Sequence, residues 1–236
     1  MEVPVQGRPE VGVRPGRARR IAAAGLAAVL LAGVVVAVGV LFASPSDVPS
    51  DPRQIPAGGA CVAAPGASQQ DVDQEDTPEY PWAHSPGQGV TVYFETGNLP
   101  PRYAGFVETG AGIWSQSPCI EAIAIDRCPA DAACSTVASV ARARGGGTDG
   151  ESRGVQRDGV RVGNAITLYT GLLDEASDNG ALAVVVHEMG HALGLVHRND
   201  RDSVMNAVTD DRTDPVPDAI DFHNLTTIYG AVQSEG

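Results

Sequence analysis

The sequence predicts an α+β domain, in which helices pack on a twisted, mixed sheet of about five strands, preceded by an N-terminal transmembrane helix. Three observations support this fold class. Residues 21–44 are apolar and carry no charge. From residue 90 on, short segments alternate apolar and polar residues, as half-buried strands do. A longer apolar segment at 180–195 has the length and spacing of a helix.

The apolar run at 21–44 is long enough to span a bilayer. Arginines are frequent before it, and it is longer than the apolar core of an ordinary secretory signal. We therefore expect residues 1–20 to be a cytoplasmic tail and the run to be an uncleaved anchor, which sends the rest of the chain outside the cell. Cleavage would instead give a secreted protein. A buried soluble helix is disfavoured because no face of the run is polar.

Residues 45–87 are rich in Pro, Gly, Ser and acidic side chains, so we interpret them as a flexible linker to a folded domain at 88–236. The formal net charge of −13 argues against a nucleic-acid partner. A membrane contact is expected through the anchor, and a monomer is expected otherwise.

All four cysteines follow the apolar run, and an even number in an oxidising compartment suggests two disulfides. Three pairings can be drawn. We favour Cys128 with Cys134, which closes a short loop, and Cys61 with Cys119, which ties the linker to the domain. A zinc ribbon is disfavoured because the chain has no CxxC pair.

The elements of the folded domain follow in chain order. A helix is predicted at 100–117, where aromatic and apolar residues recur at helical spacing after a proline start. The glycine-rich stretch at 145–154 is predicted to be a long exposed loop. A second helix is predicted at 180–195. Strands are predicted at 90–95, 120–126, 135–143, 159–163 and 165–173.

The second helix carries the segment HEMGHALGLVH. His187 and His191 are four residues apart and therefore project from the same helix face, close enough to bind one ion. Gly194 can take the positive φ at which a helix turns sharply, so that His197 can return as a third ligand. Glu188 stands beside the ligands without being one of them.

Three neutral imidazoles would leave a fourth position on a zinc ion for water, which distinguishes a catalytic zinc from a structural one. Any single histidine would ordinarily be a core residue. The chain holds only five histidines, however, and chance does not place three of them with a glutamate and a glycine at this spacing.

The motif HExxHxxGxxH, followed by Met205 in DSVMNAV, resembles the signature of the metzincin zinc metalloproteases, and of matrixins in particular. In that family the methionine supports the ligands from below without binding the metal. Residues 216–230 resemble the closing helix of matrixins. The chain is also similar to the small bacterial snapalysin group, although those proteins carry Asp where this chain has His197.

The resemblance implies that residues 88–236 form a zincin or metzincin-like catalytic domain that hydrolyses peptide bonds in extracellular proteins. It implies one catalytic Zn²⁺ held by His187, His191 and His197, with Glu188 as general base. Gly194 and Met205 would then be structural supports. Protein or peptide substrates would lie extended along an exposed strand edge, which we place in residues 153–163.

Two features depart from the matrixin pattern. Residues 85–186 contain no histidine, so the second, structural zinc of that family is not expected. A Ca²⁺ ion is an additional candidate, with Asp149, Glu151 and Asp158 as oxygen ligands, although a solvated loop explains these residues more simply. Cys61 lacks the flanking residues of an inhibitory cysteine switch, so a spacer is the preferred interpretation of the segment that contains it.

Two other functions remain open at this stage. The chain could be a non-catalytic zinc-binding or adhesion module at the cell surface, but such a module has no use for Glu188. It could also be a zinc hydrolase that acts on a non-peptide amide. The sequence leaves the substrate side-chain preference undetermined, because the loop at 206–218 is expected to line the specificity pocket.

Overall fold

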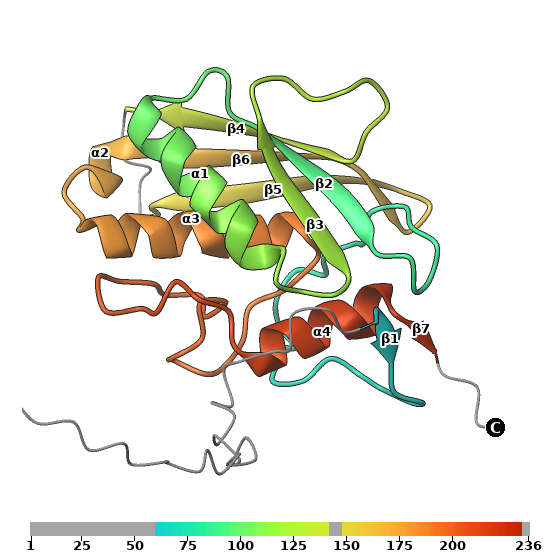
Figure 1. The fold of residues 1–236 in the computed structure, drawn as a ribbon. Coiled ribbons are helices and arrows are strands. Elements are labelled where there is room, and N and C mark those ends of the chain that lie inside the picture. Colours follow the sequence, from blue (N-terminus) through green and yellow to red (C-terminus); the bar gives the residue numbers. More distant parts are fainter. Residues whose placement is uncertain (1–59, 142–147, 233–236) are drawn as a thin grey trace, which may run out of the picture. The chain divides into compact units, whose positions relative to one another are not determined.

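A computed structural model of the chain describes residues 60–141 and 148–232. The predicted tail and anchor at 1–44 lie outside these residues. Among the residues that are described, no helix has both the length and the apolar character needed to cross a membrane. The described residues divide into an upper part, built on a large sheet, and a lower part below the helix α3 (Figure 1).

The predicted mixed sheet is confirmed, with five strands in the order β3-β2-β4-β6-β5. Four of the strands are parallel to their neighbours, and β5 is antiparallel to β6 at one edge. The inward residues of β2, Val92 and Phe94, are fully buried. The strands are β2 (Val90–Glu95), β3 (Ile120–Ile125), β4 (Cys134–Val140), β5 (Gly150–Arg157) and β6 (Val160–Tyr169).

Two local predictions differ from the structure. The loop predicted at 145–154 contains the start of β5, because residues from Gly150 on pair with β6, a partner that local composition does not reveal. The strands predicted at 159–163 and 165–173 form the single strand β6, which ends at Tyr169 and is followed by the short helix α2 (Thr170–Leu173).

Two long helices pack against the sheet and against each other. Helix α1 (Pro101–Trp114) begins with a proline in its first turn, where the missing N–H costs no hydrogen bond. Helix α3 (Asp178–Ala192) is capped by Ser177, whose side chain accepts a hydrogen bond from the Gly180 N–H. Trp114 of α1 is fully buried and donates from Nε1 to the Val186 carbonyl at 3.0 Å, which fixes the two helices together.

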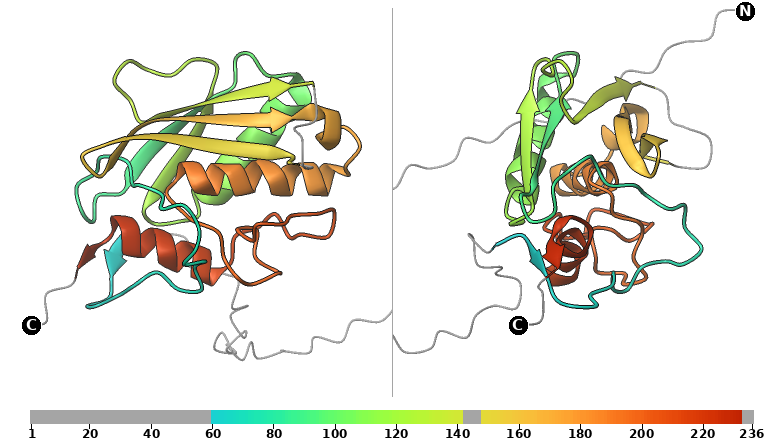
Figure 2. Two further views of the ribbon diagram at one scale, coloured as in Figure 1. Left: turned by 180° about the vertical axis from the view of Figure 1, so that it is seen from behind. Right: turned by 90° about the vertical axis from the view of Figure 1, so that its right-hand side faces the viewer.

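The lower part is built around α4 (Ala219–Tyr229), which confirms the predicted closing helix. Its first turn is stabilised by a capping box between Asp218 and Asp221. Below α3, the chain between His197 and α4 follows an irregular path (Figure 2). Strands β1 (Val62–Ala63) and β7 (Ala231–Val232) form a small parallel pair beside α4.

The described half of the predicted linker, residues 60–87, belongs to this fold. Trp82 is buried and donates from Nε1 to the Ala192 carbonyl at 2.8 Å. Both favoured disulfides are present, Cys61–Cys119 and Cys128–Cys134, and the first ties the segment to the start of β3. Composition suggested a flexible linker because it does not show long-range contacts. The polar residues of this segment contact parts of the chain that are distant in sequence.

Gly190 provides a test of how tightly α3 sits on its surroundings. A methyl group at this position would lie 2.9 Å from Cζ2 of Trp114 and closer still to Sδ of Met205. We expect Gly190→Ala to lower the free energy of unfolding by about 1–3 kcal/mol, through overpacking of buried side chains. Gly112→Ala is the matched control, since it lies on a helix with no atom within 4 Å of the added methyl. Thermal unfolding compares them, and equal melting temperatures would show that α3 is loosely packed.

Candidate metal centre

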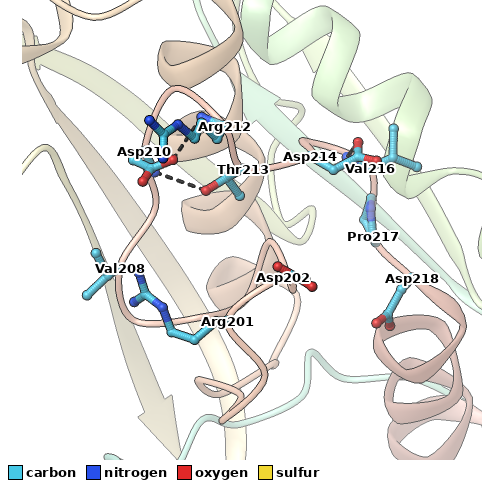
Figure 3. A pocket seen from close by; sticks show the side chains of 10 residues that line it. All are labelled: Arg201, Asp202, Val208, Asp210, Arg212, Thr213, Asp214, Val216, Pro217 and Asp218. Atoms are coloured by element: carbon cyan, nitrogen blue, oxygen red, sulfur yellow. Dashed lines mark hydrogen bonds between the residues drawn. The ribbon is translucent and has the colours of Figure 1, made fainter.

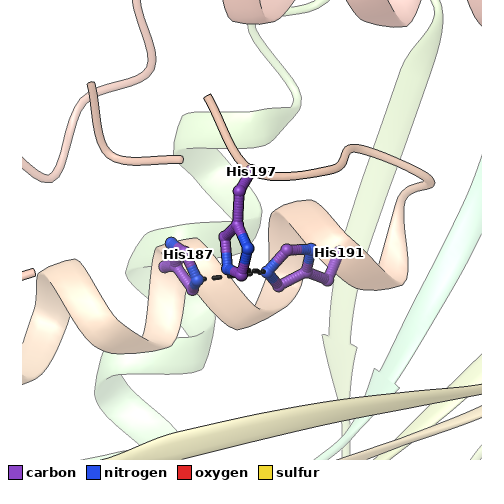
Figure 4. A group of neighbouring side chains, drawn as sticks. All are labelled: His187, His191 and His197. Atoms are coloured by element: carbon purple, nitrogen blue, oxygen red, sulfur yellow. Dashed lines mark hydrogen bonds between the residues drawn. The ribbon is translucent and has the colours of Figure 1, made fainter. Parts of the chain in front are cut away.

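Three imidazole rings converge beside α3 (Figure 4). His187 and His191 project from one face of α3, one helical turn apart. The helix ends, and Gly194 takes a φ of +98°, a left-handed value that favours glycine. The chain then reverses and brings His197 to the same point. Nε2 of His191 lies 3.1 Å from Nε2 of His187 and 3.2 Å from Nε2 of His197.

These separations fit a zinc ion. Tetrahedral zinc with Zn–N distances of 2.0–2.1 Å places its nitrogen ligands about 3.3 Å apart. Among the described residues, these three histidines and the set Glu95, Cys128 and Cys134 have the geometry of a metal cluster. The two cysteines are bonded to each other in a disulfide, which leaves the histidines as the candidate site.

The outer nitrogen of each ring on α3 is held by a backbone carbonyl. Nδ1 of His187 lies 2.7 Å from the Val204 oxygen, and Nδ1 of His191 lies 2.8 Å from the Leu195 oxygen. A carbonyl can only accept, so each Nδ1 must carry the proton and donate it. This fixes the tautomer in which Nε2 has a free lone pair for a metal.

His197 is held differently, by a carboxylate. Oδ2 of Asp76 lies 3.0 Å from Nδ1 of His197 and accepts the His197 backbone N–H at 2.9 Å. Sequence reasoning missed Asp76, because an acidic run with no regular spacing looks like solvated linker.

Burial keeps the two rings on α3 neutral. Removal from water lowers the pKa of His187 to about 4, and the same cause, with the neighbouring histidines, lowers the pKa of His191 well below its usual value. Neutral imidazole is the form that binds a metal, so the fold favours the ligand state.

Glu188 lies in the same cleft and is almost fully buried. Burial, with smaller contributions from Glu151 and Glu79, raises the pKa of its carboxyl group to about 8 in the metal-free protein. A divalent cation nearby would favour the carboxylate form instead. The backbone of β5 approaches this side chain so closely that a methyl group on Gly150 would lie 2.6 Å from Oε1 of Glu188.

Met205 is fully buried beneath the helix that carries the ligands. Its side chain lies against Gly190, and its carbonyl accepts the Arg198 N–H at 2.8 Å. These contacts couple the chain after His197 to α3, and the support role that the resemblance implies for Met205 stays a prediction.

A buried arginine, Arg161 of β6, also supports the site and was not singled out from sequence. Its guanidinium donates to the carbonyls of His191 at 2.9 Å and Tyr80 at 3.0 Å, and pairs with the Glu79 carboxylate. It therefore joins the sheet, the end of α3 and the N-terminal segment. The role of Arg161 is visible only in its contacts with residues far away in sequence, because a single arginine in a strand belongs to no recognisable sequence motif.

The cleft around the histidines has a volume of about 680 Å³. Residues 76–80 line one side, residues 150–156 of the β5 edge line another, and α3 with His197 lines the base. A second hollow, of about 550 Å³, lies in the loop between Arg201 and Asp218, which overlaps the loop predicted to determine specificity (Figure 3).

The candidate calcium ligands do not form a cluster with metal-binding geometry within the described part of the chain. Glu151 instead pairs with Arg153 and accepts a hydrogen bond from the Tyr169 hydroxyl at 2.9 Å. Calcium binding by Asp149, Glu151 and Asp158 stays a prediction from sequence.

Comparison with known proteins agrees with this geometry. A family model described as Matrixin matches residues 125–230, which include α3, all three histidines and α4. Matrix metalloproteinase-A of Caenorhabditis elegans is 41% identical to this chain over 75 residues, or 32% of this chain and 14% of that protein. The chain thus matches only a small part of the length of this relative.

Metal uptake tests the site directly. We expect the purified chain to bind one zinc ion and His197→Ala to bind it about 100-fold more weakly or worse. The reason is that a four-ligand zinc site contributes about 10–16 kcal/mol, of which one ligand supplies a substantial share. His223→Ala is the matched control, because that ring contacts Gln70 and lies outside the cluster. Equal zinc affinity in both variants would exclude His197 as a ligand.

Proposed function

We propose that this chain, whose residues 125–230 belong to the matrixin family of metalloendopeptidases, is a zinc-dependent endopeptidase that hydrolyses peptide bonds in extracellular proteins. The observation that carries the proposal is the convergence of His187, His191 and His197 next to Glu188 in one open cleft. A purely structural zinc would have four protein ligands and no open position.

The chemistry divides between the ion and the chain. The three imidazoles would hold a zinc ion, which would supply a Lewis acid toward water and the scissile carbonyl. Glu188 accepts a proton from the attacking water and passes it to the departing nitrogen, so that the amine leaves neutral. The carbonyls of Val204 and Leu195 keep the rings on α3 in position throughout.

The substrate is proposed to bind as an extended strand along β5. This strand is at the edge of the sheet, and residues 152–156 of it line the cleft. Main-chain groups on the outer side of an edge strand are free to pair with a peptide, which suits a protein substrate and not a small amide. The predicted range of 153–163 overlaps this edge and includes the turn that follows it.

The setting of the enzyme is proposed from the sequence. The apolar run at 21–44 would hold the domain at the outer face of the membrane, and its cleavage would release a secreted enzyme. The domain would act as a monomer on proteins near the cell surface. A non-catalytic zinc-binding or adhesion module remains the alternative. It is disfavoured because such a module has no use for Glu188 in the cleft.

Cleavage of an unfolded protein such as casein tests the proposed activity. We expect the full chain to cut it, a zinc chelator to abolish the cutting, and Glu188→Ala to lower kcat by about 10²–10⁴, the usual contribution of a general base. Zinc content is measured on the same samples, because Glu188→Ala should retain the ion. Activity that persists in both the variant and the chelated protein would rule out the proposed mechanism.

Modified peptides test the binding mode without altering the enzyme. We compare one long peptide substrate with versions N-methylated at single successive residues. Each lost hydrogen bond to β5 should raise KM about 2- to 10-fold, and the affected residues should alternate, because only every second N–H of a strand faces a given neighbour. A uniform effect along the peptide would contradict strand pairing.

A further inference from the structure

We propose that the segment at 71–76 is part of the metal centre and that Asp76 is a positioning residue for the third zinc ligand, His197. The inference rests on the proposed zinc site. It concerns residues that precede the part of the chain matched by the matrixin model, so the match does not provide it.

The segment binds the chain at His197 and at the residues that follow it. Oδ2 of Asp76 accepts the backbone N–H of His197 at 2.9 Å and lies 3.0 Å from Nδ1 of its ring. The His197 carbonyl in turn accepts the Asp73 N–H at 2.8 Å. The backbone N–H of Asn199 donates to the Asp71 carbonyl at 3.1 Å. Every polar backbone group of His197 and its outer ring nitrogen are therefore held by residues more than a hundred positions earlier.

His197 needs this support more than the other two ligands. His187 and His191 stand on a buried helix, whereas His197 lies in an irregular segment and its side chain is 26% exposed. The carboxylate of Asp76 accepts the Nδ1 proton, which leaves Nε2 as the ligand atom and orients it toward the other two rings. A negatively charged acceptor also increases the basicity of the imidazole more than a neutral carbonyl does.

The segment at 71–76 is itself held in place by two further interactions. Arg198, next to His197 and almost fully buried, donates to Asp71 at 3.1 Å, to Asp218 at 2.7 Å and to Asp221 at 3.0 Å. It thereby fixes the start of the segment to the N-terminus of α4. The disulfide Cys61–Cys119 joins the chain that precedes the segment at 71–76 to the sheet.

Zinc affinity of the full chain, held in mild detergent because of the run at 21–44, tests the proposal. A chromophoric chelator competes for the ion, so no substrate is needed. Removal of a carboxylate that supports a metal-binding histidine weakens binding about 10- to 100-fold, and we expect this for Asp76→Ala. Asp76→Asn, which keeps an acceptor oxygen and loses the charge, should fall between this variant and the original chain.

Glu75→Gln is the matched control, because it removes one negative charge from the adjacent, exposed position. It should leave the affinity unchanged. The visible spectrum of the Co²⁺-loaded protein gives a second readout, since it reports the ligand field and should change for Asp76→Ala and not for Glu75→Gln. If Asp76→Ala fails to fold, Asp76→Asn decides the question by the same two measurements.

Zinc affinity within twofold of the original in the Asp76 variants, with an unchanged Co²⁺ spectrum, would overturn the proposal and leave the proposed peptidase activity intact. An original chain that binds no zinc would overturn it as well. A chain that binds zinc in an Asp76-dependent way and cuts no protein would support this proposal while it removes the proposed function.

Discussion

The structure depends on bringing three imidazoles together in a mostly buried position, with Nε2 of His191 3.1 Å and 3.2 Å from the Nε2 atoms of His187 and His197. Because Nδ1 of His187 and of His191 donates to a carbonyl, the inward Nε2 of each of these rings carries a lone pair that can bind a metal. A divalent cation satisfies them at once. The surrounding chain supplies what the ion cannot, an acceptor for the outer nitrogen of each ring: the carbonyls of Val204 and Leu195, and the carboxylate of Asp76.

The rest of the fold positions these acceptors. Helix α3 packs on the sheet through buried apolar contacts, is fixed to α1 by the hydrogen bond from Trp114, and ends where Gly194 permits a sharp reversal. Below it, Met205 fills the space against Gly190, and the residue before it, Val204, offers its carbonyl to His187. Met205 therefore contacts α3 through its side chain, while the preceding residue contacts a histidine ring through its backbone carbonyl.

Local sequence patterns predicted the parts of the fold that local forces determine. The strand at 90–95, the helices at 100–117 and 180–195 and the ligand spacing follow from periodicity, proline and glycine positions, and the geometry of a helix turn. The resemblance carried by HExxHxxGxxH added the closing helix and the expected role of Met205. The start of β5 at Gly150 was missed, because pairing with β6 specifies it, whereas the local sequence at 145–154 is rich in glycine. Asp76 and Arg161 were missed for the same reason, since a single charged residue becomes part of a site only through a partner far away in sequence.

Zinc K-edge X-ray absorption on the zinc-loaded chain tests the central claim most directly. We expect three nitrogen ligands with imidazole scattering at about 2.0–2.1 Å and one further light atom, as in an open zinc site. A first shell that contains sulfur, or one with fewer than three imidazoles, would contradict the convergence of His187, His191 and His197 on one ion.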